Sequence, residues 1–366
     1  MEIRKYTAAQ LKAWTESQEY QQLENVPVSR LRVYSYVHNP RLADKNDVIA
    51  YLAFDGNTLV AYRTLLPDRL LLNAQTVNLH WFSGSWVHPS QRRKGIASQL
   101  LQEIVKDKGN ALGASNWAPA SKKVYDKSGL FETLNQTGIR CYMRFDLATI
   151  LEARFGKRKL NHLLLKAFDK TANVLAYPFF AIRKYRWPKS ALSFEYLHIP
   201  DNDCLNWLTR HERFEPNLRG KAEFEWICSY PWIKEAPLRS AQNSRYYFSS
   251  TAKRFNQFVV KFYYTNTCVG FAMVTLRDGF MKIPYWYVER NFTQDAVVIL
   301  LQMAQQNKTC TLTTTHPDVV SVLRTHYWEF WAKKDFQHGF FLSKELFQQL
   351  PANAFFQDGD ADGVFV

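Results

Sequence analysis

The sequence feature that most constrains the fold is a turn at residues 92–97, Arg-Arg-Lys-Gly-Ile-Ala. A stretch rich in strand formers, Val77 to Val87, comes before this turn and ends at His88-Pro89. After the turn, apolar residues recur at helical spacing. They are Ile96, Leu100, Leu101 and Ile104. The pattern predicts a strand, a short turn and a helix that begins near a glycine.

Such a turn is suited to binding an anion. The first turn of a helix leaves backbone N–H groups without intrahelical partners, and the helix dipole adds partial positive charge there. Together these groups form a site for a pyrophosphate. Gly95 has no side chain, so phosphates can approach the backbone. The candidate cofactor-binding residues are Val87, Arg92, Arg93, Lys94, Gly95, Ile96 and Ala97.

This stretch resembles the acyl-CoA-binding motif of the GNAT superfamily of N-acetyltransferases, Gln/Arg-x-x-Gly-x-Gly/Ala. Arg92, Gly95 and Ala97 fill its three fixed positions. The lead-in Val87-His88-Pro89 is also typical of the family. A later segment, Asn116 to Phe131, resembles the family's helix that ends in Tyr-x-x-x-Gly-Phe. Tyr125 and Gly129 match that pattern, and Leu130 precedes Phe131.

The resemblance covers residues 1 to 147 in element order, and it implies a chemistry. The cosubstrate would be acetyl-CoA or another acyl-CoA, held in a splay between the strands Val77–Val87 and Asn110–Asn116. A backbone N–H of the first strand would hold the acyl carbonyl, and a primary amine would attack the thioester directly. Tyr125 would be the catalytic acid that protonates the departing thiolate. Its alternative role is that of an ordinary half-buried helix tyrosine.

The sequence does not assign a general base. His80 and His88 are candidates, because imidazole titrates near neutral pH. Either histidine can equally be structural, and His88 can cap the turn beside it.

The order of elements predicts a mixed α/β (α+β) GNAT-like fold with a mostly antiparallel central sheet. Thr7 is a plausible N-cap for a helix through Leu23. The turn Asp55-Gly56-Asn57 predicts a hairpin. The predicted strands of this half are Asp47–Asp55, Asn57–Leu72, Val77–Val87, Asn110–Asn116 and Arg140–Phe145, and its later helices are Lys94–Lys106 and Ala120–Lys127.

We expect two related domains and a connector. Residues 1–150 would be the acyl-CoA-binding catalytic domain, 151–190 a basic amphipathic helical connector, and 191–366 a second, degenerate GNAT-like domain with an acidic C-terminal tail. The second half repeats the order of elements. Its predicted elements are the hairpin Phe258–Tyr264 and Cys268–Leu276, the strands Met281–Val288, Thr309–Thr315 and Phe340–Leu342, and the helices Thr293–Gln306 and Pro317–Thr325.

The second half lacks the glycine turn. The corresponding residues 287–295 contain no glycine, and Glu289 and Asp295 would repel a pyrophosphate. We expect this half not to bind CoA and to shape the acceptor site. The aromatic run 224–232 could line an acceptor pocket, but such runs are more often core. The tail 357–366 resembles a calcium loop only loosely, because it lacks the final acidic ligand. A flexible tail is therefore expected.

The connector is strongly basic within a chain of formal net charge +14. Asp169 is the only acid between Arg154 and Lys189, against ten lysines and arginines. Three interpretations are open: a solvated helix that packs its leucines on the domains, which we favour, a segment that lies on an anionic membrane, or one that binds nucleic acid. A tandem GNAT-like ligase that uses aminoacyl-tRNA is a further alternative to the acyltransferase.

Cysteine usage and the N-terminus indicate the compartment. The five cysteines are far apart and form no C-x-x-C pair, so we expect reduced thiols and no metal site. The first five residues do not begin a signal peptide, and the apolar-leaning run Thr171 to Ile182 is too short to span a bilayer. We therefore expect a cytoplasmic enzyme that uses acyl-CoA and a small-molecule or peptide amine acceptor.

Overall fold

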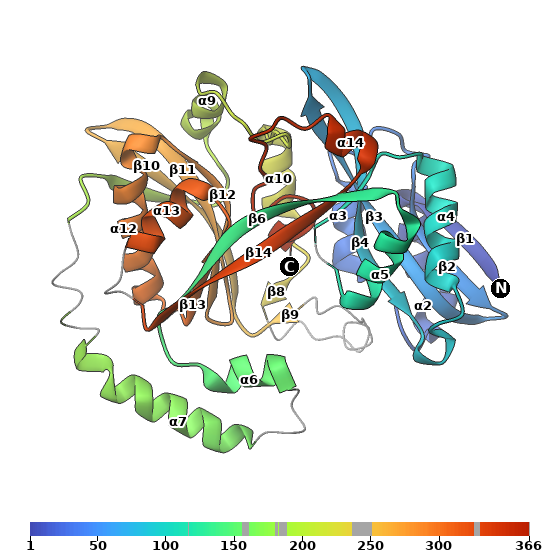
Figure 1. The fold of residues 1–366 in the computed structure, drawn as a ribbon, viewed down its shortest axis with the longest axis horizontal. Coiled ribbons are helices and arrows are strands. Elements are labelled where there is room, and N and C mark those ends of the chain that lie inside the picture. The colour runs from blue at the N-terminus through green and yellow to red at the C-terminus, as the bar shows by residue number, and fades with distance from the viewer. Residues whose placement is uncertain are drawn as a thin grey trace. The chain divides into compact units, whose positions relative to one another are not determined.

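The computed structural model describes residues 1–115, 117–155, 161–179, 182, 189–235, 251–325 and 330–365. They form two compact units (Figure 1). Unit 1 contains Met1–Gln136, His198–Gln257 and His338–Val366, and unit 2 contains Thr137–Leu197 and Phe258–Gln337. Some predicted features lie outside the described residues: the strand end Asn116 and the basic residues Lys157, Arg158, Lys159, Arg183, Lys184 and Arg186.

The sheet of unit 1 begins as an antiparallel meander. Its strands are β1 Glu2–Thr7, β2 Val48–Asp55, β3 Thr58–Leu72, β4 Gln75–Val87 and β5 Leu112–Ala114. Neighbours pair antiparallel from β1 to β4, whereas β4 and β5 pair parallel. The predicted hairpin at Gly56 is present, with a left-handed φ of 56°. The GNAT-like fold class is thereby confirmed in its main strands.

Helices pack on this sheet and set its core. They are α1 Ala8–Thr15, α2 Gln18–Gln22, α3 Arg30–Val37, the 3₁₀ turn η1 Pro89–Gln91, α4 Ile96–Lys108 and α5 Pro119–Ser128. Thr7 caps α1 as predicted, but the expected single helix to Leu23 is wrong, because Ser17 caps a separate helix α2. α4 begins two residues later than predicted and buries the expected apolar face.

Two later segments complete unit 1. They contain α9 Asn202–Arg210, α10 Lys221–Ser229, β8 Lys234–Glu235, β9 Thr251–Ala252, α14 Lys344–Gln348 and η4 Gly363–Phe365. The aromatic run is core, because Phe224, Trp226 and Trp232 are buried. The expectation of a flexible tail is wrong, since Phe356 and Phe365 are also buried. Apolar side chains between the acids hold the tail in the unit.

Unit 2 repeats the element order of unit 1. Its elements are β7 Ser193–Leu197, β10 Phe255–Tyr264, β11 Thr267–Arg277, β12 Phe280–Val288, η3 Arg290–Phe292, α12 Thr293–Gln306, β13 Thr311–Thr314 and α13 Pro317–Thr325. β11 and β12 pair antiparallel, and β12 and β13 pair parallel, as β3, β4 and β5 do. The predicted repeat of elements is therefore present.

Two long strands each have residues in both units. β6 spans Phe131–Tyr142 and β14 spans Ala332–Ser343. Within unit 2, the end of β6 pairs with β13, and within unit 1, the end of β14 pairs with β5. The predicted strands Arg140–Phe145 and Phe340–Leu342 were too short, and the former was also displaced. The predicted domain boundaries at residues 150 and 190 stay a prediction.

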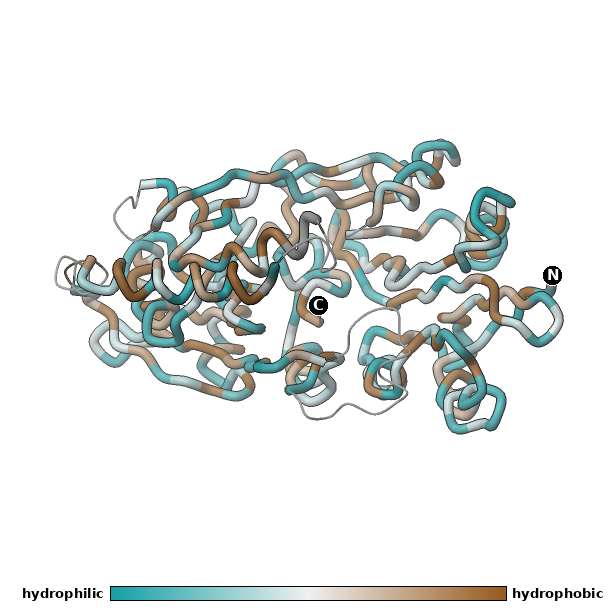
Figure 2. Tube along the Cα trace, turned by 90° about the horizontal axis from the view of Figure 1, so that it is seen from below, coloured by the Kyte–Doolittle hydropathy of each residue, from teal (hydrophilic) through white to brown (hydrophobic). Residues whose placement is uncertain are grey.

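Two helices of unit 2 occupy the predicted connector. α6 spans Leu147–Phe155 and α7 spans His162–Leu175. The expectation that this segment packs its leucines on the domains is wrong for α7, because Leu163 and Leu164 are 81% and 67% exposed. Figure 2 shows apolar residues along this helix. No helix in the described part of the chain is long and apolar enough to cross a membrane.

Candidate active site

The turn before α4 has the conformation that an anion site requires. Arg93 and Gly95 have left-handed φ values of 68° and 81°. Gly95 is the N-cap of α4, and no side chain caps the helix there. A Cβ on Gly95 would meet no atom within 4 Å, so space in front of the helix is open. The first N–H groups of α4 are therefore available to a ligand.

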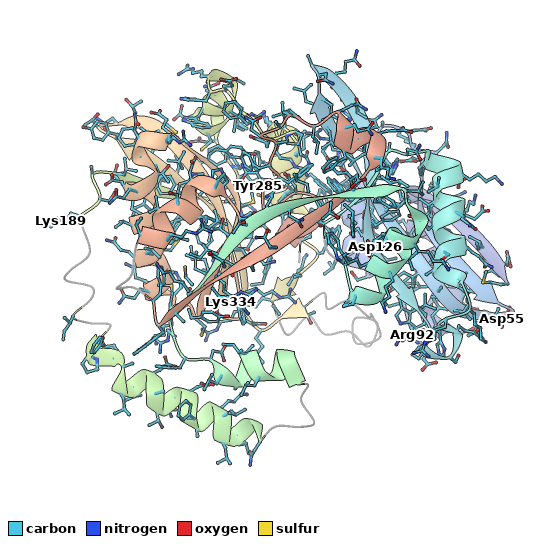
Figure 3. All side chains as sticks on the ribbon, viewed as in Figure 1. Asp55, Arg92, Asp126, Lys189, Tyr285 and Lys334 are labelled. Atoms are coloured by element: carbon cyan, nitrogen blue, oxygen red, sulfur yellow. The ribbon has the colours of Figure 1, made fainter. Side chains whose placement is uncertain are left out.

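Basic side chains surround this turn. Arg92 and Arg93 are exposed, and Arg92 Nε donates to Val87 O at 3.3 Å, which ties the turn to the end of β4. Lys94 Nζ donates to Gln91 Oε1 at 2.8 Å. Figure 3 shows Arg92 in this turn. Of the remaining predicted residues, Ile96 is buried as an anchor of α4 and Ala97 is half-buried in its first turn.

Among the described residues, no strand pairs with the edge of β4 beside the turn. β4 pairs with β5 at His80–Leu112 and Trp81–Gly113, but continues to Val87. His88 N–H donates to Val60 O on β3. Because N–H directions alternate along a strand, the N–H groups of Val87 and Ser85 are expected to face the open edge. This open edge corresponds to the splay that the resemblance implies, and it exposes backbone N–H donors of β4.

A bulge bends β4 in the middle of this open edge. The register with β3 shifts between Arg63 and Leu65, and Gly84 has a φ of 98°. A Cβ on Gly84 would lie 3.0 Å from Thr64 Oγ1 and 3.2 Å from Arg32 Nη2. Both the backbone and the space therefore require glycine here. The bulge places Ser83 beside the splay, where Arg32 donates to its hydroxyl at 2.6 Å.

Tyr125 lies deep in α5, next to the bulge. Its ring stacks on Phe82 at 5.4 Å and meets Phe131 and Phe341 edge-on at the same distance. Burial raises the pKa of the phenol, a nearby Arg63 lowers it and Asp362 raises it. The phenol is consequently protonated at neutral pH, as a proton donor must be.

Arg63 is a buried cation beside this tyrosine. Its guanidinium lies 4.8 Å from the Phe82 ring centre and 5.2 Å from that of Tyr125. The side chain is 1% exposed, and its Nε and Nη1 have no hydrogen-bond partner among the described residues. A buried cation with unused donors stabilises negative charge that develops near it.

The C-terminal segment brings a carboxylate to the splay. Ser83 Oγ donates to Asp362 Oδ2 at 2.6 Å, and Ser115 Oγ lies 3.3 Å from Asp362 Oδ1. Ser83 belongs to the β4 bulge and Ser115 follows β5, so Asp362 joins the two strands where they diverge. Sequence reasoning missed this residue. The only signal was an acid flanked by buried apolar residues in the tail.

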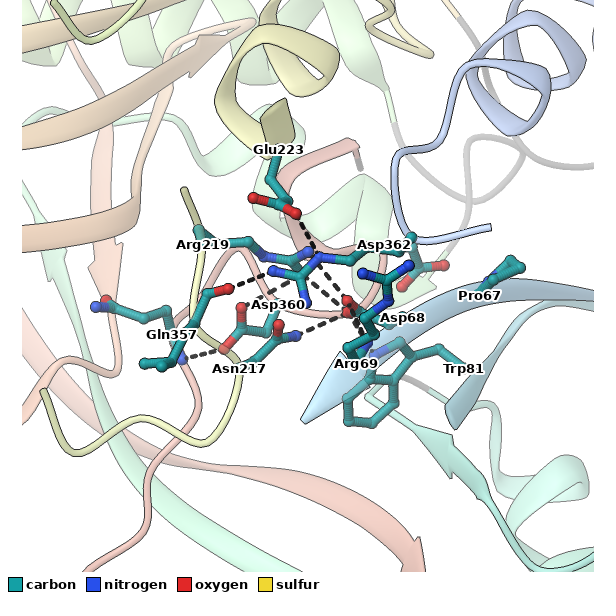
Figure 4. Close-up of polar contacts among 12 residues, drawn as sticks. Pro67, Asp68, Arg69, Trp81, Asn217, Arg219, Glu223, Gln357, Asp360 and Asp362 are labelled. Carbon is teal, nitrogen blue, oxygen red and sulfur yellow. Dashed lines mark hydrogen bonds and ion pairs between the residues drawn. The ribbon is translucent and has the colours of Figure 1, made fainter. Parts of the chain in front are cut away.

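A buried polar cluster anchors that segment (Figure 4). Arg219 forms a bidentate pair with Asp68 at 3.1 and 2.9 Å, and Asn217 Nδ2 also donates to Asp68 at 2.7 Å. Arg219 lies 3.6 Å from Asp360. The pKa of Asp360 is raised to about 8, because the effect of burial, together with the neighbouring Asp68, outweighs the lowering by Arg219.

Aromatic packing holds the end of the segment. The ring of Phe365 stacks on Trp232 at 4.4 Å and meets Trp226 at 5.0 Å. Arg32, which contacts the β4 bulge, also lies over Trp232 at 4.2 Å. The tail is therefore fixed on both sides of Asp362.

The two candidate histidines have structural partners. His80 Nε2 lies 2.6 Å from Asp47 Oδ2, and Lys108 also pairs with that carboxylate. His88 accepts from Ser90 N at 3.3 Å and so caps η1, the alternative that the sequence left open.

The turn of unit 2 differs as predicted from the sequence. α12 begins at Thr293 after Phe292, and none of the residues 289–293 is a glycine. Asp295 lies in the first turn of the helix and accepts from Ala191 N at 2.7 Å. An acid at this end opposes a phosphate.

Comparison with known proteins finds a family model that matches the N-terminal part of the chain. The sequence model described as acetyltransferase (GNAT) domain matches residues 2–133. No curated protein matches the chain. Among solved structures, a protein of unknown function from Enterococcus faecalis V583, described as a probable N-acyltransferase, matches with a TM-score of 0.52 at 10% identity. The match covers 94% of this chain and 73% of that one.

Two further structures show lower scores. A GCN5-related N-acetyltransferase from Anabaena variabilis ATCC 29413 has a TM-score of 0.49 at 13% identity, covering 93% of this chain and 72% of that one. A tandem GNAT protein from the clavulanic acid biosynthesis pathway has a TM-score of 0.46 at 13% identity, covering 93% and 97%. The match to the GNAT acetyltransferase domain model covers residues 2–133, which is the part of the chain that carries the predicted resemblance.

Proposed function

We propose that unit 1 transfers an acyl group from acyl-CoA to a primary amine by direct attack. The observation that carries this proposal is the uncapped, left-handed turn at Gly95, which lies beside the open edge of β4. The helix N-terminus and the free strand edge follow one another along one surface. This order suits a ligand in which a pyrophosphate is followed by an amide-containing arm.

Each part of the acyl-CoA would have its own partner. The N–H groups of Gly95, Ile96 and Ala97 would bind the pyrophosphate, with Arg92, Arg93 and Lys94 at the rim. The open N–H groups of Ser85 and Val87 would pair with the amides of the arm. One N–H of this edge would also polarise the thioester carbonyl.

Two side chains would move the protons. The amine nitrogen attacks the thioester carbon, and the proton that it loses goes to the carboxylate of Asp362. The C–S bond then breaks, and Tyr125 gives its phenolic proton to the leaving sulfur. Arg63, buried beside Tyr125, would stabilise the negative charge until that proton is transferred.

Asp362 is suited to the base role by its surroundings. Ser83 and Ser115 fix the carboxyl group at the divergence of β4 and β5, where an acceptor amine must approach the thioester. Neither His80 nor His88 has this position. Both are held by other partners.

The alternative functions lack comparable support. A ligase that uses aminoacyl-tRNA does not need the glycine turn, which is intact here. A protein without catalytic activity would not need the pair of Tyr125 and Asp362 beside an open strand edge.

The function is tested by the release of CoA thiol in the presence of acetyl-CoA and a panel of amines: amino acids, amino sugars, polyamines and a lysine peptide. We expect thiol release that depends on one class of amine. No release with any of them, together with no binding of acetyl-CoA or longer acyl-CoAs, would overturn the proposal.

The base assignment has its own test. Asp362→Asn should lower kcat by about 100-fold and leave the KM for acyl-CoA unchanged. Asp126→Asn, on the exposed side of α5, is the matched control and should keep full activity. An unchanged kcat in Asp362→Asn would remove the residue from the mechanism but leave the acyltransferase proposal standing.

A further inference from the structure

Helix α7 turns apolar side chains toward solvent. Its most exposed apolar residues are Leu163 at 81%, Leu164 at 67%, Val174 at 63% and Leu175 at 76%, and Phe168 is 54% exposed. In a water-soluble helix such residues normally face the protein. An exposed apolar stripe of this kind marks a surface that contacts a protein partner or a membrane.

The helix divides into three sectors. At 100° per residue, the five exposed apolar residues fall within about 140° of the circumference. Asp169 and Ala176 lie on the opposite side and are buried. Lys166 and Lys170 lie between these two sides and are exposed. The helix therefore has an apolar face toward solvent, lysines at the flank of that face, and the side that carries Asp169 toward the protein.

Specific hydrogen bonds fix this inverted orientation. Asp169 accepts from the N–H groups of Leu147 and Ala148 at 2.8 and 2.9 Å, and so caps the start of α6. Asn173 donates to Phe145 O at 2.8 Å and accepts from its N–H at 3.1 Å. Because these bonds hold the polar side inward, the leucines cannot turn toward the unit without losing them.

The sequence that contains α7 carries charge of nearly one sign. The stretch from Arg154 to Lys189 contains ten lysines and arginines. Its only acid, Asp169, is the residue that caps α6 and is buried. The outer surface of α7 consequently offers no negative charge, and the chain as a whole carries a formal +14.

We infer that α7 lies on an anionic membrane surface, with its leucines in the interfacial layer and its lysines against lipid headgroups. An amphipathic helix with an apolar face and flanking lysines has this partner chemistry. Nucleic acid would satisfy the lysines but would leave Leu163, Leu164 and Leu175 in water. A second copy of the chain would bring the same positive charge against itself.

The test is sedimentation of the full-length protein with vesicles of phosphatidylcholine, with and without one quarter phosphatidylglycerol. We expect binding to the anionic vesicles and at least tenfold weaker binding to phosphatidylcholine alone. Leu164→Gln/Leu175→Gln should weaken binding to anionic vesicles at least tenfold. Lys166→Gln/Lys170→Gln should weaken it by a similar factor and reduce its dependence on salt.

Leu71→Gln is the matched control, because Leu71 is an exposed leucine of β3 in unit 1. It should bind vesicles as the wild type does. The substituted leucines are exposed, so circular dichroism and unfolding temperature should be unchanged in each variant.

Four results would overturn the inference. The first is a wild-type protein that does not sediment with anionic vesicles at low salt. The second is a double-leucine variant that binds as well as the wild type. The third is a dimer, detected by light scattering, that Leu164→Gln/Leu175→Gln dissociates while vesicles stay unbound. That result would assign the stripe to a second copy. Binding of a nonspecific RNA in place of vesicles, sensitive only to the lysine variant, would overturn it as well.

Discussion

Replacement of Gly95 by glutamate separates ligand binding from folding. Gly95 has a φ of 81°, so any side chain costs about 1–2 kcal/mol of backbone strain. No atom lies within 4 Å of the added Cβ, so the Cβ itself meets no steric overlap. We therefore expect Gly95→Glu to fold, with a modestly lower free energy of unfolding.

The loss of affinity has a separate cause, which is charge repulsion. A glutamate carboxylate about 5 Å from a phosphate charge, at an effective dielectric constant of about 20, is repelled by about 3 kcal/mol. Solvent screening reduces this at an exposed turn. Since about 1.4 kcal/mol corresponds to tenfold in Kd, we expect acetyl-CoA to bind at least tenfold more weakly.

Isothermal titration of acetyl-CoA measures this effect, and Gly56→Glu is its control. Gly56 also has a left-handed φ, at 56°, and open space around its Cβ position, but it lies in the β2–β3 hairpin. It should lose similar stability and no affinity. Equal affinities for wild type and Gly95→Glu would refute the assignment of the turn to pyrophosphate.

Three further predictions concern the acid and the tail. Tyr125→Phe should lower kcat by about tenfold or more at an unchanged KM for acyl-CoA; an unaffected kcat in thiol-release assays would make the tyrosine structural. Asp360 has a folded pKa of about 8, raised from 3.8, so the folded state keeps a proton that the unfolded state releases. Stability should therefore fall as pH rises from about 4 to about 8 and then level off. Urea unfolding across this range should show a flatter profile for Asp360→Asn, and an identical slope would contradict the shift. Phe365→Ala should cost about 3 kcal/mol of unfolding free energy and also lower kcat, because it loosens the segment that carries Asp362; a stable variant with normal turnover would show that the aromatic anchor is unnecessary.

Local patterns predicted the elements that local chemistry determines. The hairpin at Gly56, the turn at Gly95 and the end of α5 at Gly129 are each set by a glycine with a left-handed φ. Alternation and helical spacing identified β2, β3, β4 and the buried face of α4. The candidate cofactor turn could be located for the same reason, because its residues are consecutive.

Features that depend on distant residues could not be predicted. Asp362 lies at the splay because Ser83 and Ser115 bind it, and because Trp226 and Trp232 hold Phe365 nearby. No spacing in the sequence connects these positions. The orientation of α7 likewise depends on hydrogen bonds from α6 to Asp169, which periodicity does not reveal.

The pairing of β14 with β5 has a consequence for synthesis of the chain. β5 pairs with β4 on one side and with β14 on the other, and the ribosome makes β14 long after the turn at Gly95. Asp362 is made later still. Domains usually fold as they emerge from the ribosome. Here one edge of β5 stays unpaired until β14 has been made. Pairing between segments that are distant in the sequence is slow. Under the proposed function, a nascent chain has no complete acyltransferase site until β14 and Asp362 have been made.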